Sequence, residues 1–217
     1  LYSMDNNYGN FAAGICFYND PSVLRLLDSL PESVCKIVVD GRFKLSGFEN
    51  KLSDESLREK IRQRKNTILV DAPDLHEHTK RNVFLKMMDE FRYCLVLDSE
   101  EFVMESDWPV FVSNCEKLDE GIYQVHYYST EHGGDCIYPR LWVNPSSWEH
   151  HHCHNIYRNR NTGQILYAGH VSYDLPIPGL KMGMNDALRN KEYLNEIELY
   201  KSKLGMYEDY QRKEHEL

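Results

Sequence analysis

A short apolar segment that ends abruptly in acids constrains the fold of this chain more than any other feature. Residues 93–97 (Tyr-Cys-Leu-Val-Leu) are followed by Asp98, Ser99, Glu100 and Glu101. An apolar run of this kind is typical of a parallel strand that is covered on both faces. Open α/β sheets bind ligands just beyond the carboxyl ends of such strands. We therefore expect a site here in which carboxylates hold a divalent cation and the cation holds phosphates.

Three earlier segments also have the composition of buried strands, and helical patterns separate the four segments. Residues 21–30 follow Asp20, a suitable N-cap, and residues 53–64 form a charged helical pattern with Ser53 as its expected cap. A third apolar stripe covers residues 83–91. The alternation predicts a parallel sheet with crossover helices. The three earlier strands are expected at residues 11–17, 34–39 and 67–70, and the second and third of them end in Asp40 and Asp71.

The second half of the chain has a different pattern. Residues 121–128 alternate and are rich in aromatic side chains, and residues 137–143 form another expected strand. Residues 148–158 are crowded with histidine, and from about residue 184 the pattern is helical and charged. No internal repeat and no domain boundary is visible, so we expect one domain over residues 1–217.

Composition excludes some classes of function. The net charge of −9 argues against nucleic acid as a partner, because phosphate backbones require clustered Lys and Arg. The basic stretch at residues 58–65 is interpreted as a solvated helix face. No apolar run approaches 18 residues, so we expect no membrane span. The six cysteines form no CxxC pair, which indicates reduced thiols and a cytoplasmic protein.

Several segments, taken in order, resemble the family 2 glycosyltransferases of the GT-A fold. The turn Tyr18-Asn19-Asp20 is similar to the family's Asn-acid turn after its first strand, and residues 36–41 resemble its aspartate-bearing second strand. Residues 80–83 match the Arg-Asn step of the helix before the metal strand. Residues 95–103 match the D-x-D segment, with Glu100 as the second acid. The match is loose beyond residue 105, where residues 138–142 and 153–155 resemble the family's PRLF and HE segments.

The resemblance implies a Rossmann-like, mostly parallel central sheet flanked by helices. It implies a nucleotide-sugar half at about residues 1–105 and an acceptor-side half with a C-terminal helix at about residues 106–217. The implied reaction moves a sugar from a nucleoside-diphosphate sugar to an unidentified glycan, lipid or protein acceptor, with inversion and with Mg²⁺ or Mn²⁺. The family's later Glu-Asp motif, which supplies the base in many inverting members, is not recognisable here.

Each candidate residue takes a role from its place in these motifs or from its chemistry. Asn19, Asp40 and Asp71 are assigned to the nucleoside. Arg81 is expected to reach the diphosphate or to brace the acid cluster, and Ser99 is assigned to the binding of the nucleotide sugar. Asp98 and Glu100 are the expected metal ligands, with His154 or His170 as further candidates for the metal or phosphate. Among the acids available as the general base (Glu131, Asp135, Glu149 and Asp174), we favour Glu149.

Two other functional classes stay open. A nucleotidyltransferase also uses strand-end acids and Mg²⁺, but it needs a Gly-rich basic loop after the first strand, where this chain has residues 18–21. A non-enzymatic module is the other, with a transition metal bound by the cluster at residues 150–154. On a continuous strand, His150, His152 and His154 would share one face.

Overall fold

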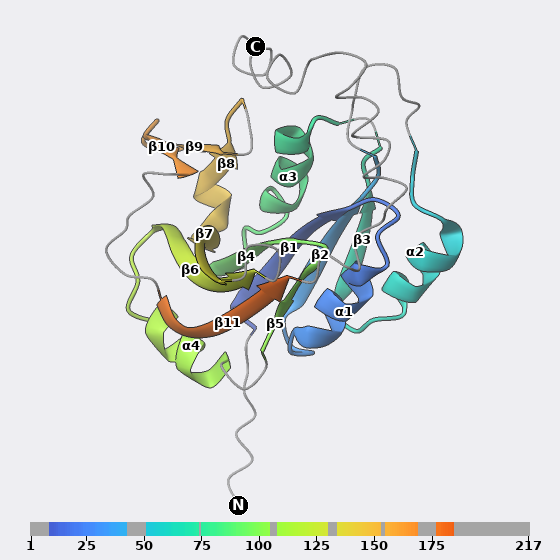
Figure 1. The fold of residues 1–217 in the computed structure, drawn as a ribbon. Helices are drawn as coiled ribbons and strands as arrows, with labels where there is room; N and C mark the ends of the chain where they lie inside the picture. Colours follow the sequence, from blue (N-terminus) through green and yellow to red (C-terminus); the bar gives the residue numbers. More distant parts are fainter. Residues whose placement is uncertain are drawn as a thin grey trace, which may run out of the picture.

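The computed structural model describes residues 9–42, 51–73, 75–104, 108–129, 134–152, 155–168 and 177–184. The α/β architecture expected from the sequence is confirmed, with helices on both faces of a central sheet (Figure 1). The first elements are β1 (Phe11–Phe17), α1 (Ser22–Ser29), β2 (Cys35–Asp40), α2 (Glu55–Arg62), β3 (Thr67–Asp71), α3 (Glu77–Leu85), β4 (Tyr93–Asp98) and β5 (Glu101–Val103). They are followed by α4 (Trp108–Cys115), β6 (Gly121–Ser129), β7 (Gly134–Val143), the 3₁₀ turn η2 (Pro145–Ser147), β8 (Trp148–His150), β9 (Ile156–Asn159), β10 (Ile165–Tyr167) and β11 (Ile177–Met184).

The central sheet has the strand order β3-β2-β1-β4-β7-β6-β11-β5. Its first four strands are parallel, as the alternating sequence pattern predicts. The chain moves from β1 outward through β2 to β3, and then returns to place β4 on the other side of β1. The order therefore reverses between β1 and β4, and the carboxyl ends of these two strands form a topological switch point.

The rest of the sheet is mixed. β7 runs antiparallel to both β4 and β6, β11 runs parallel to β6, and β5 closes the sheet antiparallel to β11. β8, β9 and β10 form a separate antiparallel sheet of three strands. The sequence analysis did not anticipate α4, β5 or β11. The expected C-terminal helix lies outside the described residues.

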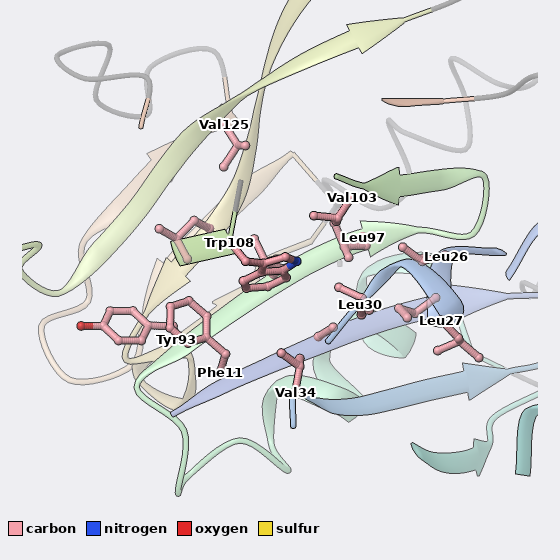
Figure 2. Packing of buried hydrophobic residues seen from close by; sticks show 14 of the residues in the cluster. Phe11, Leu26, Leu27, Leu30, Val34, Tyr93, Leu97, Val103, Trp108 and Val125 are labelled. Atoms are coloured by element: carbon pink, nitrogen blue, oxygen red, sulfur yellow. The ribbon is translucent and has the colours of Figure 1, made fainter. Parts of the chain in front are cut away.

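The central sheet separates two apolar cores. One core joins the sheet to α1, α2 and α4, and Figure 2 shows Leu26 and Leu27 of α1 and Trp108 of α4 packed over Phe11 and Leu97. The other core joins the opposite face to α3 and the three-stranded sheet through Phe84, Trp142 and Tyr157, among others. Because β1 is buried on both faces, its uninterrupted apolar sequence is explained.

A glycine in β1 sets how closely α3 approaches the sheet. A Cβ atom placed on Gly14 would lie 2.2 Å from Cδ2 of Phe84, so the phenyl ring occupies the space that any other residue would fill. The Phe84 side chain is fully buried there. Because position 14 has no side chain, α3 packs close to β1, and side chains of α3 can contact the carboxyl ends of the strands.

Two expectations from composition can be compared with the described residues. Among the residues whose side chains the structure describes, Cys16, Cys35, Cys94 and Cys115 are free thiols. Across the described ranges, no helix combines the length and the hydrophobicity that crossing a bilayer requires.

Candidate functional site

Asp98, at the end of β4, lies between two arginines that come from different elements. Its Oδ1 accepts a hydrogen bond from Arg81 of α3 at 2.7 Å, and its Oδ2 accepts one from Arg140 of β7 at 2.6 Å. Arg81 is also paired with Glu77, four residues earlier on the same helix. The Asp98 side chain is 28% exposed, so one side of this group is open to solvent.

A β-bulge aims Arg140 at this site. Tyr123 of β6 pairs with Leu141 and the next residue, Gln124, pairs with Pro139, so Arg140 has no partner on β6. The additional residue reverses the sides of the strand, and Tyr138 and Leu141 both pack against the core that contains α1. Bulges of this kind redirect side chains beside functional sites. Here the redirected side chain is the guanidinium group that contacts Asp98.

Glu101 completes this network from below the surface. Its Oε1 accepts a hydrogen bond from Arg140 at 2.6 Å, and its Oε2 accepts one from the backbone N–H of Asp98 at 2.8 Å. Burial raises the pKa of Glu101 to about 8, even though Arg140 opposes this. Burial also acts to raise the pKa of Asp98, but Arg140 and Arg81 outweigh it and hold that pKa below its ordinary value. Asp98 is therefore the ionised carboxylate of the pair.

The ends of β1 and β4 are joined directly at the switch point. The Ser99 hydroxyl donates to Oδ2 of Asp20 at 2.6 Å, and the Ser22 hydroxyl donates to the Ser99 carbonyl at 3.1 Å. Oδ1 of Asp20 accepts from the backbone N–H of Ser22 at 3.0 Å, which is the capping role that the sequence predicts. Glu100 follows, partly exposed, with its Oε2 at 3.4 Å from the Ser99 hydroxyl. The structure therefore brings the Ser99 hydroxyl together with the Asp20 and Glu100 carboxylates, next in sequence to Asp98.

A second network closes the ends of β2 and β3 around Asp40. Asp40 is fully buried and accepts hydrogen bonds from the backbone N–H and the hydroxyl of Ser53, and from the Arg58 guanidinium. The other end of that guanidinium donates to Asp71 at 2.9 Å, where the Asp71 side chain is 51% exposed. Asn19, with a φ of 45°, accepts from the backbone N–H of Asp54 at 2.7 Å.

Two expectations for this region were wrong. Arg58 was expected on a solvated helix face but is only 5% exposed, because its guanidinium bridges two strand-end carboxylates. Ser53 was expected to cap α2. The helix instead begins at Glu55, and the Ser53 hydroxyl is taken by Asp40 at 2.5 Å.

Lys80 is a buried ammonium that links the ends of β1 and β2. Its Nζ donates to the Phe17 carbonyl at 3.0 Å and also to the Gly41 carbonyl. Gly41 has a φ of 132°, and a Cβ there would lie 2.5 Å from the Cα of Pro73, so this turn requires glycine. Burial lowers the pKa of Lys80 to about 8. The loops that follow both strands are thus held by one side chain of α3.

The histidine-rich segment does not continue as a strand. β8 ends at His150, and His152 has a φ of 65°, so His150 and His152 do not share a face of one strand. His154 itself, like His170, lies outside the described residues. Glu149 lies on β8, where its carboxylate is bound by Arg158 and by Arg160, the latter at 3.4 Å.

The donor set at Asp98 and Glu100 can be tested for its fit to a divalent cation. Among the residues that the structure describes, no group of three or more His, Cys, Asp or Glu side chains is placed to hold a metal. Mg²⁺, however, commonly uses one or two protein carboxylates together with phosphates and water. Each Asp98 oxygen accepts one arginine and keeps further acceptor capacity. Acids also outnumber arginines, because Arg81 and Arg140 share Glu77, Asp98 and Glu101 as partners. The set therefore fits a hard cation.

Sequence reasoning missed several residues that build this site. Arg140 was noticed only as part of the segment at residues 138–142, although an arginine in a strand that is otherwise apolar was a usable signal. Lys80 immediately precedes Arg81 on the same helix, and its burial is a property of the folded chain. Glu101 was seen only as one of the acids after β4, and its burial is a property of the folded sheet.

No family model and no curated protein matches this sequence. Solved structures of TarS from S. aureus share part of the fold. TarS 1–349 in complex with UDP-GlcNAc is 20% identical with a TM-score of 0.45, over 58% of this chain and 36% of that chain. The complex with UDP is 20% identical with a TM-score of 0.45, over 58% of this chain and 37% of that chain. A longer TarS structure is 19% identical with a TM-score of 0.43, over 56% of this chain and 22% of that chain. The chain thus spans well under half the length of these structures, and a likeness at this level does not assign an activity.

Proposed function

We propose that this chain is a glycosyltransferase that moves the sugar of a nucleoside-diphosphate sugar to an acceptor, with a divalent cation and with inversion. The observation that carries the proposal is the meeting of Asp20, Ser99 and Asp98 at the switch point between β1 and β4. Ligands of open α/β sheets bind at such points. The sequence resemblance to family 2 glycosyltransferases over residues 11–105 supplies the chemical class of the ligand.

In this proposal the nucleoside lies over the ends of β1 to β3. Asp71 offers a half-exposed carboxylate to hydroxyl or base N–H donors, and Asn19 lies on the loop after β1, where it is bound by the Asp54 backbone. Asp40 is sealed by Ser53 and Arg58, so its contribution is to hold these two residues in place under the nucleoside.

The diphosphate lies over the end of β4. Negative charge grows on it as the glycosidic bond breaks, and we assign Arg81, which donates to Asp98, and the Ser99 hydroxyl, on the next residue, as donors to that charge. Asp98 and Glu100 would hold the cation, which supplies Lewis-acid neutralisation of that charge when it is bound. Arg81 and Arg140 fix the orientation of the Asp98 carboxylate through both of its oxygens.

Inversion requires a base on the acceptor side, and we propose Glu149 for it. Arg158 and Arg160 hold the Glu149 carboxylate in one orientation on β8. Glu149→Gln keeps the size and hydrogen-bond acceptor of the side chain but cannot accept the proton. It should therefore reduce turnover and leave nucleotide affinity unchanged.

Calorimetric titration with UDP, in the presence and absence of Mn²⁺, tests the proposal. UDP and UDP-GlcNAc are suitable first probes because they are the ligands of the TarS complexes, and a panel of other nucleoside diphosphates follows. We expect Mn²⁺-dependent binding that Asp98→Asn abolishes and that Asp89→Asn, an exposed acid on the loop after α3, leaves intact. Bound ligand should also raise the melting temperature by mass action.

Other outcomes would contradict the proposal in distinct ways. Binding of a nucleoside triphosphate together with no binding of any diphosphate would indicate a nucleotidyltransferase. Zn²⁺ binding that survives Asp98→Asn, without nucleotide binding, would indicate a metal-binding module. Diphosphate binding that is unchanged in Asp98→Asn would place the ligand away from the switch point.

A further inference from the structure

Three consecutive residues of α3 bind three different parts of the molecule. Lys80 binds the carbonyls after β1 and β2, and Arg81 binds Asp98 of β4. The third, Asn82, reaches β8 in the separate three-stranded sheet. Successive residues on a helix point about 100° apart, so one rigid turn can make all three contacts.

The Asn82 amide replaces a neighbouring strand. β8 is an edge strand, since its sheet has the order β10-β9-β8. Nδ2 of Asn82 donates to the His150 carbonyl at 2.8 Å, and Oδ1 of Asn82 accepts from the His150 N–H at 2.8 Å. One side chain therefore satisfies both outward-facing backbone groups of that residue, as a paired strand would.

Aromatic side chains pack around this contact, but they do not fix the register of β8 against α3. The His150 ring lies 4.9 Å from Trp142 and 5.3 Å from Tyr157, measured between ring centroids. Such packing has little directional preference along the strand, whereas the paired hydrogen bonds of Asn82 specify a single register. The register of β8 against α3 matters because it also sets the positions of Glu149 and His151, which flank His150 in the sequence.

We infer that Asn82 is a positioning residue, which docks the three-stranded sheet at one register and so places β8 relative to Asp98. Its role in transfer rests on the proposed function: the sheet carries acceptor-side groups, and α3 links them to the donor-side carboxylate through adjacent residues. Asn82 acts through the His150 backbone and does not itself contact Asp98.

Hydrogen exchange tests the docking without any ligand. Asn82→Ala should speed exchange of the His150 amide by at least about tenfold, because its protecting acceptor is gone. Thr79→Ala is the matched control, since it is exposed on the same helix and makes a similar gain in helix propensity. Unchanged exchange at His150 in Asn82→Ala would overturn the inference.

Asn82→Asp provides a second test should the alanine variant fail to fold. A protonated carboxyl reproduces the donor and acceptor of the amide, whereas the ionised form faces the His150 carbonyl without a donor. The difference in melting temperature between wild type and Asn82→Asp should therefore grow as the pH rises from about 3 to about 7, through the ordinary Asp pKa of about 3.9 and the raised native value. A difference that does not change with pH over this range would overturn the paired hydrogen bonding.

A kinetic readout then separates positioning from donor binding. In Asn82→Ala, UDP affinity should stay within about twofold of wild type while turnover of UDP-GlcNAc falls by about tenfold or more. A loss of UDP affinity as large as that in Asp98→Asn would contradict the inference. If wild type itself binds no nucleotide, the proposed function fails, and hydrogen exchange still decides the role of Asn82.

Discussion

Arg140→Met offers a direct measurement of how strongly the fold depends on the arginine that the β-bulge redirects. The wild-type guanidinium is 11% exposed and makes two charge-assisted hydrogen bonds, each 2.6 Å long, to Asp98 and Glu101. Methionine keeps the apolar part of the side chain and removes the charge. Asp98 still has Arg81, but the Glu101 carboxylate, which has no exposed surface, is left with one backbone donor.

The expected cost follows from those contacts. Charge-assisted hydrogen bonds contribute roughly 1.5–3 kcal/mol each, and breaking a buried ion pair typically costs about 3–5 kcal/mol. We therefore expect Arg140→Met to lower the free energy of unfolding by about 3–5 kcal/mol. At about pH 9, above the Glu101 pKa of about 8, much of this loss is the cost of leaving the buried Glu101 carboxylate without an arginine, so at that pH the double variant Arg140→Met/Glu101→Gln should recover about 2 kcal/mol.

Urea unfolding of wild type, both single variants and the double variant, followed by circular dichroism, completes a double-mutant cycle. A coupling free energy of at least about 1.5 kcal/mol between positions 140 and 101 is expected from their direct contact. Coupling below roughly 0.5 kcal/mol, or a cost for Arg140→Met alone under about 1 kcal/mol, would refute the view that this pair stabilises the end of β4.

Two further predictions concern α3 and the strand that it covers. Because burial lowers the pKa of Lys80 to about 8, the unfolded state binds more protons than the native state from about pH 8 to pH 10.5. The free energy of unfolding of wild type should therefore rise by up to about 3 kcal/mol relative to that of Lys80→Met over that range. Urea unfolding at several pH values measures this difference. A stability difference that falls or stays flat there would contradict a depressed pKa. Gly14→Ala should lower the free energy of unfolding by about 1–3 kcal/mol, because it forces a methyl group against Phe84. Phe84→Leu in the same chain should reduce that loss. Thermal unfolding of wild type, the two single variants and the double variant would show this. Equal costs with Phe and with Leu at position 84 would place the strain elsewhere.

The parallel half of the sheet could be predicted from local sequence. Strands β1, β2 and β4 are largely apolar runs with helical patterns between them, and their buried, two-sided environment is what such runs indicate. The positions of Asp40, Asp71 and Asp98 at strand ends followed from the same reasoning. The edge strand β3 is only partly buried, but its β-branched residues and the following Asp71 were sufficient.

The partners of those acids could not be predicted, because they come from distant parts of the chain. Arg140 lies 42 residues from Asp98, and its direction depends on a bulge in the pairing of β6 with β7. Arg58 resembles an exposed helical residue in sequence, and only the packing of α2 beside β3 reveals that it bridges two carboxylates. The end of β8 at His150 was also missed, since a run of histidines gives no periodic signal for a turn.

The bulge at Arg140 also has a consequence for redesign of the β6–β7 hairpin. Pairing with β4 fixes the orientation of residues 141–143. The residues before the bulge take their orientation from the one extra residue in β7, Arg140. Deleting that residue would exchange the two sides of β7 before the bulge. Tyr138 would then point away from the core that contains α1, and the positive charge beside Asp98 would be lost. A change of length in this hairpin would therefore reorient all residues on the far side of the bulge from β4, whereas a substitution changes one position.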